Sequence, residues 1–143
     1  MSQPAEIKPS PEQLQKIRLL SDGELYRMAC QFIADNRTIE SNKQAVSLVM
    51  HTQDWDDLDR YVNHQAGRDW KSQKKYAGYE QFFKNLKNQL AELRTKVENE
   101  WFPPPPEYKT RNERKAWVNH FTILVAREFL QHLEAENFYK SGN

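Results

Sequence analysis

A basic block that also contains aromatic residues, at residues 60–75, carries the side chains best suited to bind a ligand. Arginine and lysine neutralise phosphate groups, and tryptophan or tyrosine rings stack on unpaired bases. This combination is typical of proteins that bind single-stranded nucleic acid. The candidate nucleic-acid-binding residues are Arg60, His64, Arg68, Trp70, Lys71, Lys74 and Lys75. The alternative is a solvated basic loop whose aromatic side chains belong to the core.

Three basic residues of this block are spaced by four positions. Arg60, His64 and Arg68 would share one face if a single helix carried all three. Gly67 lets the backbone turn sharply and could present Arg68 away from that helix. The face is then either a ridge that meets nucleic acid or a helix surface without a ligand.

Motifs for catalysis or metal binding are scarce. The sequence has no glycine-rich phosphate loop and no nucleophile elbow. Its single cysteine, Cys30, falls on the apolar side of a predicted helix, which favours burial over nucleophilic use. Glu128, His132 and Glu136 have a spacing that can chelate a metal, but no second set of ligands accompanies them. We therefore expect neither a metal nor another cofactor.

One pair of residues has a spacing that is known from an enzyme family. Arg127 and His132 resemble the short Arg-x4-His motif of the all-helical HEPN ribonucleases. In such a site the histidine would act as a general acid or base, and the arginine would hold the phosphate. With nine arginines and four histidines in 143 residues, such pairs also arise by chance. We assign no catalytic residue, and a metal-independent ribonuclease that uses Arg127 and His132 remains the alternative.

The composition fits one compact domain in a reducing compartment. The chain has 143 residues, of which 38% are hydrophobic, 12% aromatic and 29% charged. A single cysteine excludes an internal disulfide, so the expected location is the cytoplasm. The sequence has no export signal, and no apolar run approaches the ~18–20 residues of a membrane span. We therefore expect no membrane association.

Basic residues are concentrated in the middle of the chain. Residues 60–96 contain nine basic and three acidic side chains, against six and ten in residues 1–59 and six and seven in residues 97–143. The formal net charge of the whole chain is only +1. A nearly neutral protein with one basic block can hold a polyanion locally without coating nucleic acid in general.

Capping signals predict two helices near the N-terminus. Residues 10–13 (Ser-Pro-Glu-Gln) and 21–24 (Ser-Asp-Gly-Glu) each form a capping-box pattern that should open a helix. Leu14 and Ile17 should share one face of the first of these helices. The second should bury a stripe at helical spacing, made of Leu25, Met28, Ala29, Phe32 and Ile33. Residues 1–9, with two prolines, should form a disordered lead-in.

Two further helices should follow before the middle of the chain. One should start at Ser41, with Ala45, Leu48, Val49 and Thr52 on its inner side. The other should begin at the aspartates of residues 54–57, where negative charge suits the helix dipole, and end near Gly67. Its inward-facing residues should be Leu58, Tyr61 and Val62.

The second half of the chain should contain two long helices joined by a proline corner. Alternating steps of three and four predict one buried seam, made of Tyr76, Tyr79, Phe83, Leu86, Leu90, Leu93 and Val97. We expect this seam to pack within the molecule rather than against a second copy. The prolines at 103–106 cannot be helical and should form an extended, rigid linker. A capping box at 110–113 should open the last helix, which has apolar residues on more than one face up to about Tyr139.

Together these patterns predict an all-α fold. The chain should form a single-domain bundle of five or six helices over residues 10–140, with the polyproline corner before the last long helix.

The order of three segments resembles the small helical subunit of type III CRISPR effector complexes. Residues 20–25 resemble that family's capped early helix, residues 61–68 its mid-chain helix that closes in Gly-Arg, and residues 130–139 its last helix. The resemblance implies a non-catalytic helical bundle that stacks in copies along a guide RNA and its target. By the same resemblance, the residues that contact the RNA backbone would be Arg60, Arg68, Lys71, Lys74 and Lys75.

We therefore expect a non-catalytic, RNA-associated subunit of a larger ribonucleoprotein. Its partners would be RNA, as guide or target strand, and other subunits, including stacked copies of itself. Two other classes stay open besides this one. They are the ribonuclease described above and an adaptor that binds another protein through exposed aromatic residues and has no nucleic-acid role.

Overall fold

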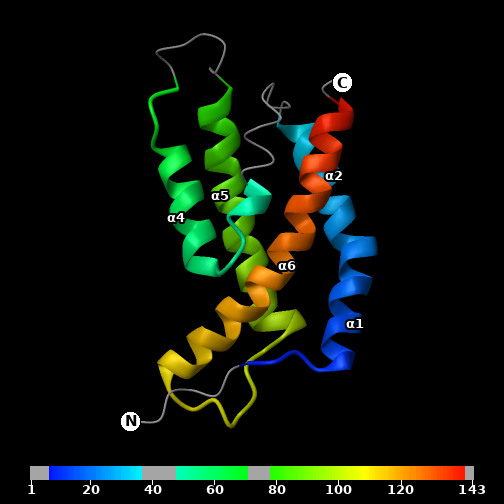
Figure 1. Ribbon diagram of the computed structural model, residues 1–143, viewed down its shortest axis with the longest axis vertical. Coiled ribbons are helices and arrows are strands. Elements are labelled where there is room, and N and C mark those ends of the chain that lie inside the picture. Colours follow the sequence, from blue (N-terminus) through cyan, green and yellow to red (C-terminus); the bar gives the residue numbers. More distant parts are fainter. Residues whose placement is uncertain (1–6, 37–47, 71–77, 141–143) are drawn as a thin grey trace.

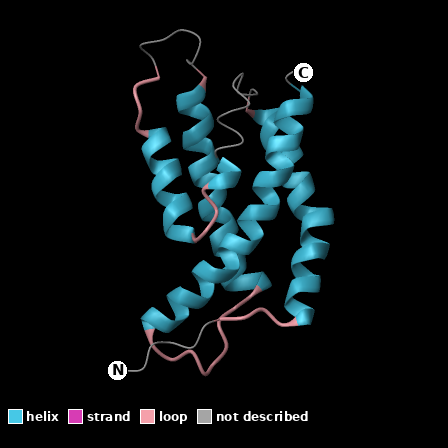
Figure 2. Ribbon diagram, viewed as in Figure 1, coloured by secondary structure: helices cyan, strands magenta, loops and turns pink. Residues whose placement is uncertain are grey.

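The computed structural model describes residues 7–36, 48–70 and 78–140, and over these ranges the chain is an all-helical packed bundle without strands (Figures 1 and 2). The predicted fold class is therefore confirmed. Five α-helices are present in these ranges: α1 Pro11–Leu20, α2 Tyr26–Asp35, α4 Trp55–Ala66, α5 Tyr79–Lys96 and α6 Arg111–Lys140.

The first two helices are continuous, which makes one boundary prediction wrong. Ser10 caps α1 with the expected capping box, and its hydroxyl accepts from the Gln13 N–H at 3.1 Å. The second box does not form, because Ser21 has helical backbone angles and starts a π-helical segment, Ser21–Leu25, that joins α1 to α2. The Ser21 hydroxyl lies 3.0 Å from His132 Nε2 of α6. A tertiary hydrogen bond has thus replaced the local cap.

The long N-terminal helix buries the predicted stripe over α2. Leu25, Ala29, Phe32 and Ile33 are all buried, and Met28 is partly buried against the same core. On α1, Ile17 is buried but Leu14, one turn before it, is 51% exposed. Over α1 only the Ile17 side of the helix faces the bundle.

Helix α4 begins and ends where the sequence indicates. The Asp54 carboxylate accepts from the Asp57 N–H at 2.8 Å, and Gly67 is the C-terminal cap. Leu58 and Val62 are buried as predicted, whereas Tyr61 is only partly buried and stacks on His51 with ring centroids 4.2 Å apart. Of the helix predicted from Ser41, residues 41–47 lie outside the described residues. Its last part is present, with Leu48 and Thr52 buried.

Helix α5 buries the predicted seam within this molecule. Its contribution begins at Tyr79, and Tyr76 lies outside the described residues. Every later member of the seam is buried, namely Tyr79, Phe83, Leu86, Leu90, Leu93 and Val97. The seam faces α4 and α6, so the expectation of packing within one chain is confirmed.

The connection from α5 to α6 contains the predicted proline corner. A π-helical segment, Val97–Trp101, ends α5, and residues 103–105 then run without helix into a turn that the Tyr108 N–H closes on Pro105 O at 3.0 Å. The Glu113 N–H donates to the Thr110 hydroxyl at 3.0 Å, which is the predicted cap of the last helix. The indole N–H of Trp117 donates to Phe102 O at 2.8 Å and holds the corner against α6.

Helix α6 runs diagonally across the bundle (Figure 1) and packs against all four other helices of the described residues. Phe121, Phe129 and Leu130 are fully or almost fully buried on different faces of this helix. Most of the apolar residues found on more than one face of this helix in the sequence are therefore buried, and the helix lies centrally in the bundle. Its apolar pattern stops short of the C-terminus, because Phe138 is 45% exposed.

The chain is packed from before the first helix. Ile7 contacts the core, so the expected disordered lead-in of residues 1–9 does not extend to that position, and residues 1–6 lie outside the described residues. Across 7–36, 48–70 and 78–140, every helix is too short or too polar to cross a lipid bilayer.

The burial of α6 leads to a stability prediction. Phe129→Ala should lower the free energy of unfolding by about 3–5 kcal/mol, because it leaves a cavity in the centre of the bundle. Tyr139→Ala on the same helix, where the side chain is 75% exposed, should change it by less than about 0.5 kcal/mol. Urea unfolding followed by circular dichroism gives both values. Equal losses in the two variants would contradict the central role of α6.

Candidate nucleic-acid interface

Three of the predicted binding residues form what we call the α4 surface: Arg60, His64 and Arg68. All three are exposed, and none of them forms an ion pair with another described residue. Asp56 and Asp59 are also exposed on α4, and Asp69 is exposed directly after Arg68. The cationic side chains of the α4 surface therefore have exposed carboxylates near them in the chain at both ends.

Arg68 is held close to the end of α4. Its Nη1 donates to Gln65 Oε1 at 3.1 Å, and its guanidinium carbon lies 4.4 Å from the centre of the Trp70 ring. Gln65 is buried, so it provides a fixed acceptor. The residue after Gly67 thus folds back over the helix end, instead of pointing away from it as the glycine suggested.

Trp70 belongs to the core, so its prediction as a base-stacking residue is wrong. Its side chain is 3% exposed, and its indole N–H donates to Gln65 O at 2.7 Å. The ring stacks on Phe83 with centroids 5.9 Å apart and contacts Tyr79 at 5.1 Å. A large apolar ring gains more from burial beside α5 than from exposure, which is the alternative that the sequence left open.

The remaining predicted contacts, Lys71, Lys74 and Lys75, lie outside the described residues. Their contribution to the α4 surface stays a prediction. They follow Trp70 directly in the chain, so they continue the basic segment that starts at Arg60.

Arg127 and His132 bind different parts of the molecule. The Arg127 Nε donates to Thr52 O at 2.7 Å, and its Nη2 lies 3.4 Å from Gln53 O. The His132 Nε2 lies 3.0 Å from the Ser21 hydroxyl, and its ring meets Tyr26 edge-on at 5.4 Å. The two side chains therefore tie α6 to two separate segments and do not converge on one position for a phosphate.

The remaining candidates for chemistry are Cys30 and the set Glu128, His132 and Glu136. Cys30 is partly buried rather than enclosed, and a hydrogen bond with it raises the pKa of Tyr26. Glu128, His132 and Glu136 form no metal-binding group with one another, because the described part of the chain contains no cluster of three such ligands.

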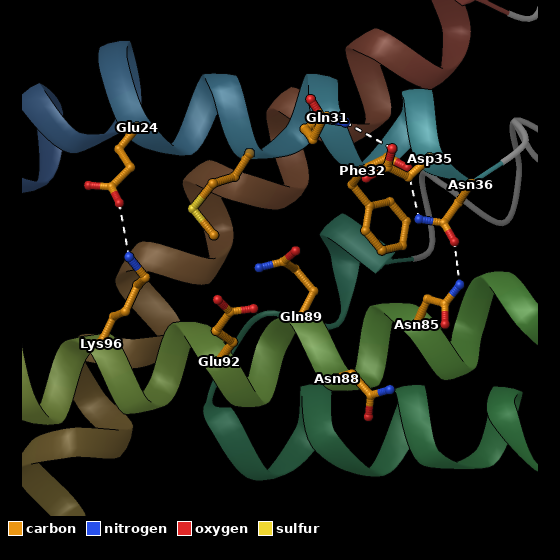
Figure 3. Close-up of a pocket in the computed structure, with 11 residues that line it drawn as sticks. Glu24, Gln31, Phe32, Asp35, Asn36, Asn85, Asn88, Gln89, Glu92 and Lys96 are labelled. Atoms are coloured by element: carbon orange, nitrogen blue, oxygen red, sulfur yellow. Dashed lines mark hydrogen bonds and ion pairs between the residues drawn. The ribbon is translucent and has the colours of Figure 1, made fainter.

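A polar cleft of about 350 Å³ lies between α2 and α5 (Figure 3). Lys96 reaches across it to Glu24 at 3.1 Å, and Asn85 donates to Asn36 at its other end. Gln89 and Glu92 point from α5 towards α2 between these two links. The polar lining consists of amides, carboxylates and the Lys96 ammonium group, with no histidine, cysteine or hydroxyl, so it can supply hydrogen bonds to a polar ligand.

The structure also shows a second basic surface that sequence reasoning missed. Lys109, Arg111, Arg114 and Lys115 surround the start of α6 and line one groove together with Arg94 of α5. The sequence feature that corresponds to this surface is a cluster of four basic residues within residues 109–115. The seven acidic residues of the whole segment 97–143, which include Glu107 and Glu113 beside this cluster, offset its charge in the sequence.

Comparison with known proteins adds no relative. The chain matches no protein-family model, no curated protein and no solved structure. Any function therefore has to be argued from the residues of this chain.

Because Trp70 is buried, replacing its side chain should lower the stability of the fold rather than remove a direct contact with RNA. Trp70→Ala should lower the free energy of unfolding by about 3–5 kcal/mol. Trp70→Phe should keep more of that stability and bind RNA like the unmodified chain, because an aromatic ring still fills the site. Chemical denaturation and fluorescence anisotropy measure the two quantities. A stable Trp70→Ala variant with weakened RNA binding would restore the stacking role.

The ion pair across the cleft predicts a shifted titration. The hydrogen bond that Lys96 donates to Glu24 raises the pKa of Lys96 above its ordinary value of 10.5, because a carboxylate stabilises the ammonium form. Glu24→Ala should return the pKa of Lys96 towards 10.5, whereas Glu80→Ala should leave it unchanged. NMR titration of the Lys96 side chain tests this. A Lys96 midpoint unaffected by Glu24→Ala would contradict the link.

Proposed function

We propose that this protein is a non-catalytic, RNA-associated subunit of a larger ribonucleoprotein that contacts backbone phosphates through the α4 surface. The observation that carries the proposal is the exposure of Arg60 and His64 on α4 and of Arg68 just after its C-terminal cap, none of them in an ion pair with another described residue. Lys71, Lys74 and Lys75 extend the same basic segment in the sequence.

Charge rather than base stacking is the mode of contact in this proposal. Trp70 is buried and Tyr61 is stacked on His51, so the aromatic residues of the block serve the fold. Guanidinium and ammonium groups recognise phosphates whatever the sequence of bases. Binding of this kind is independent of sequence and weakens as salt concentration rises.

The proposed partners follow the resemblance of three segments to the small subunit of type III CRISPR effector complexes. They are RNA, as guide or target strand, and neighbouring subunits, including stacked copies of this chain. The proposed location is the cytoplasm, which suits a chain with one cysteine. A subunit of this kind positions RNA and performs no chemistry on it. The separate partners of Arg127 and His132 favour this role over that of a ribonuclease.

Charge reversal on the α4 surface tests the proposal. Arg60→Glu combined with Arg68→Glu should weaken binding of a labelled polyuridine of about 20 nucleotides at least about tenfold, and should reduce the salt dependence of binding. Fluorescence anisotropy over a range of salt concentrations measures both effects. The loss of affinity is expected because each glutamate repels a phosphate group that the arginine would attract.

A matched control separates this effect from net charge. Arg18→Glu with Arg27→Glu makes the same change in charge on exposed arginines of the N-terminal helix, away from α4. Affinity of the α4 variant equal to that of this control would overturn the proposal. Cleavage of the RNA by pure protein in the presence of a chelator, abolished by His132→Ala, would overturn its non-catalytic part.

A further inference from the structure

A basic groove lies where the end of α5 meets the start of α6. It encloses about 850 Å³ and is lined by Arg94, Glu98, Lys109, Arg111, Asn112, Arg114, Lys115 and Val118. Five of these eight residues are cationic and one is acidic. This volume lies near the upper end of the ~300–1,000 Å³ range of small-ligand sites, so the groove has room for more than a single phosphate group.

The positive charge of the groove is largely uncompensated. Its one carboxylate, Glu98, approaches Arg94 only to 4.0 Å and is 51% exposed, so the pair is weak. Lys109, Arg111 and Lys115 are exposed and form no ion pair with another described residue. Several like charges held at one concave surface raise the local concentration of anions.

Two of the arginines are held in place by neutral partners. Arg94 Nε donates to Asn119 Oδ1 at 3.0 Å, and Arg114 Nη1 donates to Tyr108 O at 3.2 Å. Each guanidinium has five N–H donors, so these bonds orient the group while leaving other donors available for a ligand. Guanidinium forks match the paired oxygens of a phosphate group.

We propose that this groove binds the phosphodiester backbone of RNA, as a second site separate from the α4 surface. Its lining has no aromatic side chain to stack on a base, so the recognised element is the backbone. Its single apolar member, Val118, is buried, so the groove offers no apolar side chain to insert into a lipid surface or to anchor a protein partner. A flexible polyanion fits this chemistry best.

The two surfaces lie towards opposite ends of α5. Trp70, beside Arg68, packs on Tyr79 at the start of this helix, whereas Arg94 stands near its end. Fifteen residues separate Tyr79 from Arg94, a rise of about 22 Å along the helix axis. A strand that reaches both surfaces would bind more tightly than one that reaches a single surface.

Charge reversal inside the groove tests this second site. Arg111→Glu with Lys115→Glu changes exposed residues at the start of α6, where acidic side chains suit the helix dipole, so the variant should fold. Its affinity for the polyuridine of about 20 nucleotides should fall at least about tenfold relative to the Arg18→Glu/Arg27→Glu control. In the unmodified chain, amide NMR signals of Asn112 and Val118 should shift when the RNA is added.

Three outcomes separate this inference from the proposed function. Loss of affinity only in the Arg60→Glu/Arg68→Glu variant would overturn the groove and leave the α4 surface. Loss only in the groove variant would support the groove and overturn the α4 surface. Loss in both, greater when the substitutions are combined, supports two sites.

The class of ligand is tested with the same proteins. Single-stranded and duplex RNA should both lose affinity in the groove variant, and the ratio of the two losses identifies which form the groove prefers. Tighter binding to phosphatidylserine vesicles or to polyglutamate than to RNA, lost in the groove variant, would overturn the assignment to a phosphodiester backbone.

Discussion

The structure depends above all on the burial of α6 on several of its faces. This 30-residue helix packs against all four other described helices, and Phe121 and Phe129 place aromatic rings where those helices meet. Hydrogen bonds from its polar residues then fix the surrounding segments, because Arg127 holds the carbonyls at Thr52 and Gln53 while His132 meets Ser21. Arg127 and His132 resemble a catalytic pair in the sequence, but on this central helix they hold two different neighbouring segments in place.

The core also sets which side chains are available for the proposed contact with RNA. Most of its large aromatic rings pack against one another, as Trp70 does on Phe83 and Phe102 on Phe121. Cationic side chains are left at the surface, some on the α4 surface, some in the basic groove and others, such as Arg18 and Arg27, elsewhere. In the proposed function, this division of residues favours recognition of charge and of the spacing of phosphates over the identity of bases.

The candidate site was predictable in part. Arg60, His64 and Arg68 follow a helical spacing that depends only on neighbouring residues, and the structure places all three on the exposed side of α4 or at its end. The burial of Trp70 was not predictable, because a tryptophan within a basic segment suits a core and a nucleic-acid surface equally well. The basic groove was not predictable either, because the fold brings Arg94 to residues 109–115 from another helix.

Local patterns in the sequence by themselves determined the all-helical class, the buried seam of α5 and the capped start of α6 at Thr110. These features depend on contacts between residues three or four positions apart, or on an apolar spacing that any partner helix would cover. Only the tertiary structure decided that Ser21 continues a helix, that Leu14 faces solvent and that Arg127 and His132 serve different neighbours. Each of these outcomes depends on what lies beside the residue in space. A hydroxyl that can cap its own helix will leave that role when a histidine from another helix competes for it.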